Sequence, residues 1–452
     1  MLKKTGLAFL LALSLAGCDS LLDQNPVDEL PEEIAITTPE GARAALAGAY
    51  AALQEDSYYG GDFYLFGDLS SDNSVHDDDG TSNSYADADA NQLLSNNGVI
   101  DAIWASIYAA IHRANVLIDR VPSVTGIDPV ERDQILGEAY FLRALHYHNL
   151  VKIFGGVPLR LVPAASVEEA SQIARSTEAE TYTQILSDLD QAGTLMTSTS
   201  PANHATLGAV DALKARVYLF LEDYVNANAS ADAVIGAGYD LAASFSDLFD
   251  ADGQDTPEDI FKVTFTDVQF QYMYYWISCD VGGGCETAPS QELIDAFTDP
   301  YDATTDERLT WSITGSSLPL TEPDAWGTKF PTTAGGEDIH AIRFAEVLLI
   351  KAEALARQSL LSPALDEVNK IRVRAGLAPL TLGVEVTTQA EVLAEIDRQR
   401  FLELAMEGDR WSDLTRRGVA ETVLGIPAFQ TLYPIPLSEL DVAPNIVQNP
   451  GY

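Results

Sequence analysis

Apolar residues recur at intervals of three and four along most of this chain, which is the period of an amphipathic helix. The clearest stripe consists of Ile100, Ile103, Ile107, Ile111 and Ile118. Proline and glycine interrupt the pattern where helices are expected to end, as at Pro122 and Gly155. The pattern predicts a mainly α protein, with helices around this stripe and over residues 39–54, 129–154, 212–221, 227–235, 339–358, 365–375, 389–406 and 410–416.

Two stretches are predicted to form helical hairpins with small residues at the crossing. The first joins Ala212–Leu221 to Ala227–Ile235, and the second joins Ile339–Gln358 to Leu365–Ala375. Such pairs resemble tetratricopeptide units, which repeat every ~34 residues and must stack because one pair cannot bury its apolar face. Insertions separate the units here, so we expect an interrupted tetratricopeptide-like helix-pair solenoid.

Two regions without helical period interrupt this solenoid. Residues 55–97 are rich in Gly, Asp, Asn, Ser and Tyr, and they predict a long surface loop region. Residues 240–338 form a larger, loop-rich insertion with a few short strands, of which Ile260–Phe265 is the clearest. Long loops in compact proteins are usually functional, so both regions are candidates for a binding surface.

The N-terminus has the pattern of a lipoprotein export signal. Lys3 and Lys4 precede an apolar run, and the small-residue cleavage site Leu15-Ala16-Gly17 ends on Cys18. The run is shorter than the roughly 20 apolar residues that span a bilayer, so we expect acylation of Cys18 to provide the attachment. The predicted organisation is a signal peptide (1–17), an acylated tether (18–38), and two regions (39–240 and 241–452) that form one compact body.

The charge balance limits the possible partners. The chain has 68 acidic residues against 26 Lys and Arg, a formal net charge of −42. Nucleic acid is excluded as a general partner because its binding requires bases that neutralise phosphates, and polyanionic ligands are disfavoured. Such an acid excess is typical of a salt-rich habitat, where salt screens the repulsion between carboxylates.

Cysteine usage agrees with export. Apart from Cys18, the chain has only Cys279 and Cys285, on either side of a glycine-rich turn. Outside the cytoplasm such a pair predicts a disulfide, while the metal-site alternative lacks further ligands nearby. Two acidic loops, 77–80 and 250–255, could bind calcium, but neither has the twelve-residue spacing with a closing Glu. No cofactor is therefore predicted.

Residues typical of catalysis do not form a recognisable active site in the sequence. Glu407, Asp409, Arg410 and Asp413 lie at helical spacing, and we interpret them as a charge network that clamps the last helix pair. Residues 146 and 148 are both His, but two positions apart in a helix they point to different sides, so a shared metal is not expected. No Gly-x-Ser-x-Gly or His-Glu-x-x-His motif is present. The sequence predicts that the protein is not an enzyme.

Several segments, taken in order, resemble the SusD/RagB family of nutrient-uptake lipoproteins. They are Cys18 with Leu22-Asp23 and Pro26, the helix with Trp104, Tyr108 and Ala114-Asn115, Phe154-Gly155-Gly156-Val157-Pro158, Arg343–Leu349 with Ala352–Ala354, Arg372–Leu377, Glu407–Trp411, Tyr433–Pro436 and Gln448–Tyr452. Gln399-Arg400 departs from the Glu-Arg that is frequent in the family, and the cysteine loop is not a general family feature.

The resemblance implies a non-catalytic subunit on the outer face of the outer membrane, anchored by its lipid. Such a subunit captures oligosaccharides as a lid over a TonB-dependent transporter of the SusC type. Two alternatives remain open at this point, a binder of peptides or protein fragments of the RagB type and a surface glycoside hydrolase. A hydrolase would require two carboxylates roughly 5–10 Å apart across a cleft.

Sugar recognition requires flat aromatic faces for C–H patches and polar groups for hydroxyls. Both loop regions supply such residues, and the consecutive aromatics at 272–276 cannot all face one core. The predicted ligand-binding residues are Tyr64, Asp72, Asn73, Tyr85, Tyr272, Tyr274, Tyr275, Trp276 and Trp326.

Overall fold

The computed structural model describes residues 36–452, apart from residues 78, 165, 250–254, 267, 274–276, 278–283, 285, 317–318, 322–323 and 332–334. The predicted signal, the acylated Cys18 and the predicted tether up to residue 35 lie outside the described residues. So do Cys279, Cys285 and three of the predicted ligand-binding residues, Tyr274, Tyr275 and Trp276.

The first half of the body is a layer of long antiparallel helices, α3 (Pro39–Ala51), α6 (Gly98–Arg120), α7 (Pro129–Phe154) and α9 (Glu178–Leu195). Local sequence sets their ends. The Asn97 side chain accepts hydrogen bonds from the first amides of α6, and Asp128 does the same for α7, which has proline at its first position. Helix α7 ends at Gly155, whose φ of +72° is accessible to glycine at little cost.

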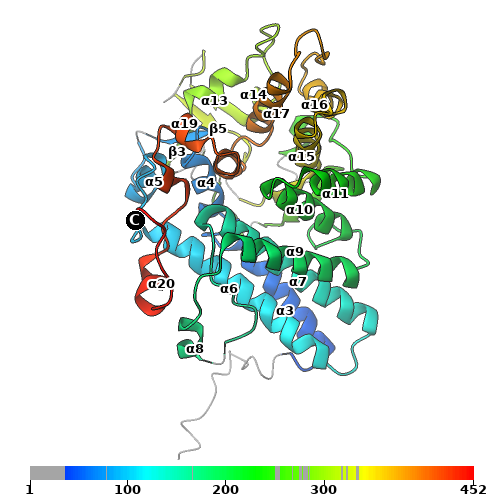
Figure 1. Ribbon diagram of the computed structural model, residues 1–452, viewed down its shortest axis with the longest axis vertical. Coiled ribbons are helices and arrows are strands. Elements are labelled where there is room, and N and C mark those ends of the chain that lie inside the picture. Colours follow the sequence, from blue (N-terminus) through cyan, green and yellow to red (C-terminus); the bar gives the residue numbers. More distant parts are fainter. Residues whose placement is uncertain are drawn as a thin grey trace, which may run out of the picture.

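The helices of the second half continue the stack. Helices α10 (Leu207–Phe220) and α11 (Tyr224–Gly236) form one hairpin, and α15 (Phe344–Arg357) and α16 (Leu361–Arg374) form another. Helix α11 packs on α15, and α17 (Gln389–Glu403) covers both α15 and α16, so the two hairpins join one array (Figure 1). The predicted helix-pair solenoid is confirmed.

Short strands and short helices gather on one flank of this array (Figure 1). Three antiparallel pairs join β1 (Ser74–His76) to β3 (Thr287–Pro289), β2 (Asp259–Val263) to β6 (Ile339–Arg343), and β4 (Ile313–Gly315) to β5 (Ala325–Gly327). The short helical elements of the described residues are α4 (Asp62–Leu69), α5 (Asn83–Asp89), α8 (Val167–Ser171), α13 (Gln291–Ala296), α14 (Leu309–Ser312), α18 (Arg410–Arg416), α19 (Ala420–Leu424) and α20 (Leu437–Val442), with 3-10 turns at Ala52–Gln54, Val121–Ser123, Phe245–Leu248 and Ala428–Thr431.

The structure corrects two expectations about secondary structure. Residues 55–97 do not form a long surface loop, because they contain α4 and α5 and bury most of α4 in the main core. The helix predicted from Ile339 begins only at Phe344, because residues 339–343 pair with β2 as a strand. Within the described part of the chain, no helix combines the length and apolarity needed to cross a bilayer.

Candidate functional site

The two predicted loop regions meet in space and form one surface, which we call the loop face: residues 55–97 together with the described residues of 241–338. Strand β1 of the first region pairs with β3 of the second. The amide of Tyr272 donates to the carbonyl of Gly60 at 2.8 Å, and the Ser290 hydroxyl donates to the carbonyl of Asp72 at 2.6 Å. Because the strand pairing and the Tyr272 contact involve backbone on both sides, the two regions are held in a defined relative position.

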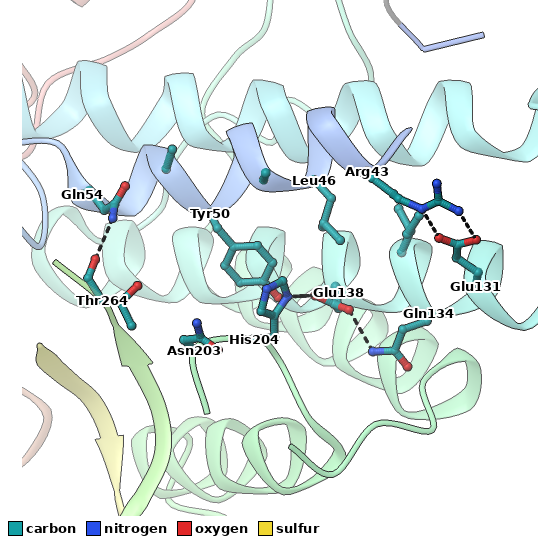
Figure 2. Close-up of a pocket in the computed structure, with 13 residues that line it drawn as sticks. Arg43, Leu46, Tyr50, Gln54, Glu131, Gln134, Glu138, Asn203, His204 and Thr264 are labelled. Carbon is teal, nitrogen blue, oxygen red and sulfur yellow. Dashed lines mark hydrogen bonds and ion pairs between the residues drawn. The ribbon is translucent and has the colours of Figure 1, made fainter. Parts of the chain in front are cut away.

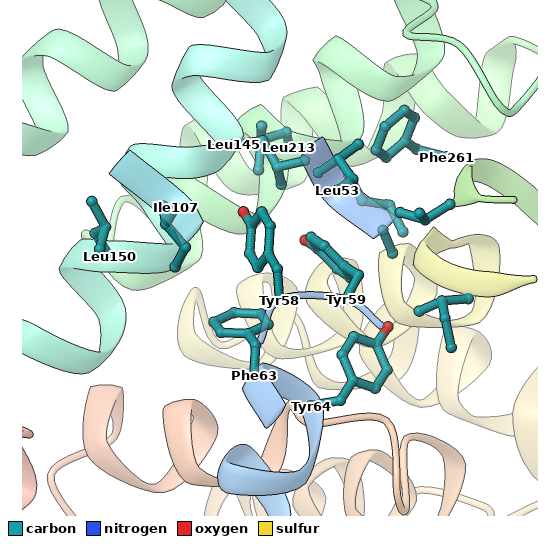
Figure 3. Packing of buried hydrophobic residues seen from close by; sticks show 14 of the residues in the cluster. Leu53, Tyr58, Tyr59, Phe63, Tyr64, Ile107, Leu145, Leu150, Leu213 and Phe261 are labelled. Carbon is teal, nitrogen blue, oxygen red and sulfur yellow. The ribbon is translucent and has the colours of Figure 1, made fainter. Parts of the chain in front are cut away.

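Most aromatic residues of the first region point into the core rather than out of the loop face (Figure 3). Tyr58, Tyr59, Phe63 and Tyr64 are all less than 7% exposed and pack on one another. The Tyr64 hydroxyl donates to the carbonyl of His340 at 2.9 Å. The prediction that Tyr64 contacts a ligand is therefore wrong for this structure, because its ring and its hydroxyl are both occupied by the protein.

Three further predicted residues have internal partners. The Tyr85 hydroxyl donates to the carboxylate of Asp62 at 2.7 Å, and its ring is 3% exposed. The Asn73 amide nitrogen donates to Asp68 at 2.8 Å from a fully buried position. Asp72 accepts two hydrogen bonds from Arg410. Interpreting Tyr85 and Asn73 as ligand contacts is corrected by their burial, and Asp72 holds two segments of the chain together.

Two predicted aromatics stay partly accessible, Tyr272 and Trp326. Tyr272 meets the ring of Phe270 edge-on, with centroids 5.0 Å apart, and Trp326 lies on β5 opposite Thr314 of β4. Sequence reasoning missed Phe270, which is 36% exposed, and Trp311, which is 45% exposed on α14 next to β4. Phe270 lies between Gln269 and Gln271, and Trp311 lies between Thr310 and Ser312; an aromatic residue with polar neighbours on both sides is the signal that could have identified them.

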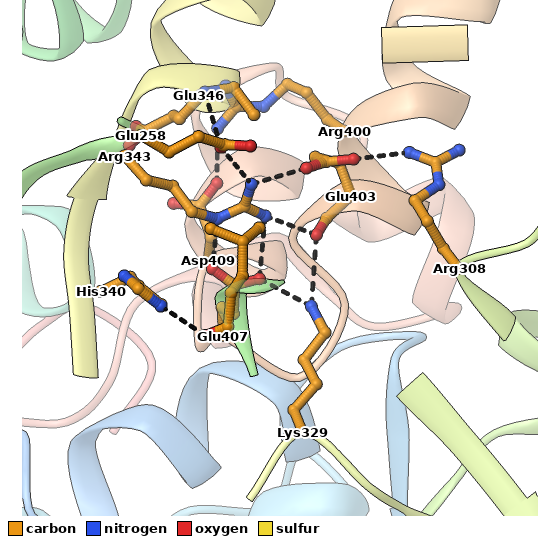
Figure 4. A network of polar contacts seen from close by, with 12 residues as sticks. Glu258, Arg308, Lys329, His340, Arg343, Glu346, Arg400, Glu403, Glu407 and Asp409 are labelled. Carbon is orange, nitrogen blue, oxygen red and sulfur yellow. Dashed lines mark hydrogen bonds and ion pairs between the residues drawn. The ribbon is translucent and has the colours of Figure 1, made fainter. Parts of the chain in front are cut away.

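Behind the loop face lies a buried network of ion pairs (Figure 4). Arg343 donates to Glu403 at 2.6 Å and to Glu407 at 2.9 Å, and Lys329 donates to Glu407 at 2.6 Å. Burial by itself would raise the pKa of Glu407, but Arg343 and Lys329 hold it below its ordinary value. These carboxylates are therefore ionised and paired, which is a structural arrangement and not that of a general acid.

The charged residues of the last helix pair form a further set of ion pairs. Asp409 pairs with Arg400, and Asp413 pairs with Arg400 and Arg416. The Arg410 guanidinium binds Asp72 and Asp397. The interpretation of Glu407, Asp409, Arg410 and Asp413 as a structural clamp is confirmed.

Most Lys and Arg side chains of the described residues are buried or half-buried, so few of them are exposed at the surface. Among the Lys and Arg of the described residues, the exposed ones are Arg43, Arg113, Arg357 and Lys370. The remaining guanidinium and ammonium groups are buried or half-buried, most of them in ion pairs. The net charge of −42 is therefore concentrated at the surface, where few bases offset it.

The two histidines of α7 have separate surroundings. His146 lies 3.0 Å from the Tyr58 hydroxyl, and burial lowers its pKa to about 3. His148 meets the ring of Phe220 edge-on at 4.9 Å. In the described ranges, no three His, Cys, Asp or Glu side chains are grouped so that they could hold a metal ion. Of the two acidic loops, residues 78 and 250–254 lie outside those ranges.

Two family models match successive parts of the chain. A SusD-like model described as starch-binding and associating with the outer membrane matches residues 21–219. A SusD family model matches residues 325–428. Together they include the predicted post-anchor segment, the first helical layer and the segments that form the ion-pair network.

Similar proteins extend over the full chain. SusD-like protein P2 of Formosa agariphila is 29% identical, with both chains covered completely, and the starch-binding protein SusD of Bacteroides thetaiotaomicron is 24% identical over 76% of each chain. A solved laminarin-binding SusD-like protein is 25% identical with a TM-score of 0.80, covering 92% of this chain and all of its own. A SusD superfamily structure from Bacteroides vulgatus, at 22% identity, has the same fold with a TM-score of 0.81, over 91% of this chain and 99% of its own.

Proposed function

Because the chain belongs to the SusD/RagB family, we propose that it captures oligosaccharides at the cell surface and delivers them to a SusC-like TonB-dependent transporter. The protein is a carbohydrate-binding protein and not an enzyme. The family associates with the outer membrane. The glycan class, the partner and the anchor are the parts that the proposal adds.

The observation that carries this proposal is a set of accessible aromatics on the loop face, namely Phe270, Tyr272, Trp311 and Trp326. Aromatic faces bind the C–H patches of sugar rings, and a rigid support lowers the entropic cost of that contact. The pairing of β1 with β3 and of β4 with β5 supplies such a support. Tyr274, Tyr275 and Trp276 remain predicted members of the same surface.

The distribution of charge favours neutral glycans. An anionic polymer would have to approach a surface with few exposed bases, and the repulsion between like charges opposes that approach. The arginines behind the loop face are paired with carboxylates and buried, so they do not compensate. Neutral sugars bind through stacking and hydrogen bonds and avoid this cost.

The proposed anchor is the acylated Cys18. A tether of about 20 residues reaches at most roughly 70 Å, which lets the body swing above a transporter without leaving it. We expect Cys18→Ala to leave glycan binding by the purified protein intact and to abolish uptake by cells. Uptake that survives this substitution would contradict the lid role, while the glycan-binding role would stand.

A calorimetric screen tests the ligand class. Purified protein is titrated with oligosaccharides of starch and laminarin, the glycans named for two similar proteins, and with a matched set of peptides. We expect binding of at least one glycan and of none of the peptides. Binding of peptides alone would establish the RagB-type alternative, and release of reducing ends from the glycans would establish hydrolase activity.

A further inference from the structure

A well-formed cavity lies away from the aromatics of the loop face. It is a groove of about 460 Å³ between α3 and α7, closed on one side by the turn at Asn203 and His204 (Figure 2). Phe270, Tyr272, Trp311 and Trp326 are not among its lining residues. This volume falls within the range of roughly 300–1,000 Å³ that is typical of small-molecule sites.

The polar wall of the groove is organised around the buried carboxylate of Glu138. Three side chains converge on it: the Tyr50 hydroxyl at 2.6 Å, the Gln134 amide nitrogen at 2.9 Å and the His204 Nδ1 at 2.9 Å. The Tyr50 and His204 rings also touch, with centroids 4.5 Å apart (Figure 2). Each polar group is thus held in place by another, and the wall is already formed without a ligand.

The amide of Asn203 adds a further hydrogen-bonding group to this wall. The Oδ1 atom of Asn203 is buried and has no partner among the described residues. Two other donors nearby are occupied, since the Gln54 amide nitrogen donates to the carbonyl of Thr264 at 2.6 Å and that of Gln134 donates to Glu138. Because the Oδ1 atom is buried, the amide nitrogen is the end of the Asn203 side chain that can reach a ligand, and the groove favours a ligand with hydroxyl groups, which can accept from it.

The apolar part of the lining comes from Leu46, Ala47 and Ala51 of α3 with Ile135 of α7. A ligand that fits this lining has hydroxyl groups for its polar part and C–H groups for its apolar part. We infer that the groove is a second carbohydrate site, which binds a neutral monosaccharide or disaccharide independently of the loop face. This site is additional to the proposed function, and it would exist whether or not the aromatics of the loop face bind glycan.

Charged ligands fit the groove less well. The surface carries a large negative charge, which opposes an anion. An ammonium group would find Glu138 already paired with three side chains, and Glu131 at the mouth is bound to Arg43 at 2.5 and 2.9 Å. A neutral polyol can bind without breaking any of these hydrogen bonds or ion pairs.

A blocking substitution at the exposed Ala47 tests this inference. Ala47→Trp fills the groove from α3 without removing any hydrogen-bonding group, and Ala44→Trp, at an exposed position of the same helix outside the lining, is the matched control. Glucose, maltose and laminaribiose are titrated by calorimetry into both variants and the parent protein, with putrescine as the cationic probe. Thermal unfolding of each variant establishes that it is folded.

We expect at least one of the three sugars to bind the parent protein and Ala44→Trp equally, and to bind Ala47→Trp at least tenfold more weakly. Trp326→Ala, on the loop face, is expected to leave this binding unchanged. Three results would each overturn the inference: no binding of any of the sugars to the parent protein, sugar binding that Ala47→Trp leaves intact, or binding of putrescine in place of sugar. The groove variants do not alter the loop face. If the groove does not bind sugar, the titrations with longer glycans therefore still test whether the loop face does.

Discussion

Arg410 binds Asp72 with two parallel hydrogen bonds, from Nε at 2.6 Å and from Nη2 at 2.7 Å, across 338 positions of the chain. The same guanidinium donates to Asp397 at 2.9 Å and lies 4.4 Å from the centroid of the Phe401 ring. The first loop region is therefore attached to the last helices by one side chain. A planar guanidinium suits this task because its donors match both oxygens of a carboxylate.

Arg410→Ala is expected to lower the free energy of unfolding by about 3 kcal/mol, because Asp72 and Asp397 keep their charges in a largely desolvated site. Urea unfolding followed by circular dichroism measures the change. Lys370→Ala, at an exposed position where its partner Glu367 also pairs with Lys351, is the control and should stay within about 0.5 kcal/mol of the parent protein. Equal effects of the two substitutions would show that the Arg410 contacts contribute little to stability.

Gly67→Ala is expected to destabilise the protein by about 1–3 kcal/mol or to prevent folding. A Cβ atom on Gly67 would lie 2.2 Å from the carbonyl oxygen of Gly408, where α4 packs against backbone that cannot move aside cheaply. Gly48→Ala is the matched control, because its Cβ would meet nothing within 4 Å in the interior of α3. That substitution should raise stability by roughly 0.5–1 kcal/mol. The melting temperatures of both variants, compared with that of the parent protein, measure these two effects: close packing at Gly67 and helix propensity at Gly48.

Glu353 makes stability depend on pH in the acid range. Burial opposes its ionisation, but Arg416, Arg400 and Arg357 hold its pKa at about 2. Since this pKa is below the unfolded value near 4.5, the stabilisation is complete above pH 4.5 and is lost as the pH falls towards 2. Glu353→Gln should cost about 2–3 kcal/mol at pH 7. The difference from the parent protein should shrink between pH 4.5 and 2, and a constant difference would contradict this assignment.

The surface charge predicts a dependence on salt. Repulsion between exposed carboxylates should destabilise the folded protein at low ionic strength, while the buried pairs around Arg343 and Glu403 are screened much less. We expect the urea midpoint to rise as sodium chloride increases from about 0.05 M to about 1 M, where the Debye length falls to about 3 Å. A midpoint that stays constant or falls would mean that attractive pairs outweigh surface repulsion.

Trp326→Ala is expected to weaken binding of neutral glycans about tenfold, in line with the roughly 0.5–1.5 kcal/mol of an aromatic contact. Tyr64→Phe should leave glycan binding unchanged, because Tyr64 is buried and its hydroxyl is bonded to the protein. Isothermal titration of both variants with the best glycan of the screen measures the contrast. If Tyr64→Phe weakened binding as much as Trp326→Ala, the loop face would have to rearrange when it binds.

Local signals explain where the sequence prediction of the fold was accurate. The bounds of α7 follow from Asp128 and Pro129 at one end and Gly155 at the other, all adjacent to the helix. The bounds of α18, Arg410–Arg416, were also predicted correctly. The sequence predicted helix for the strand Ile339–Arg343 for two reasons. The spacing of its apolar residues fits a helix as well as a strand, and its partner β2 lies about 80 positions earlier in the chain.

The sequence by itself determined the helical class, the hairpins, the acid excess and the family to which the chain belongs. Only the tertiary structure decided that Tyr64 and Tyr85 are buried while Trp326 stays accessible, and that Asp72 meets Arg410. The physical reason is that the spacing of apolar residues shows which face of a segment is apolar, but not which distant segment packs against that face. Burial and ion pairing are properties of two surfaces, and the second surface here lies hundreds of residues away in the chain.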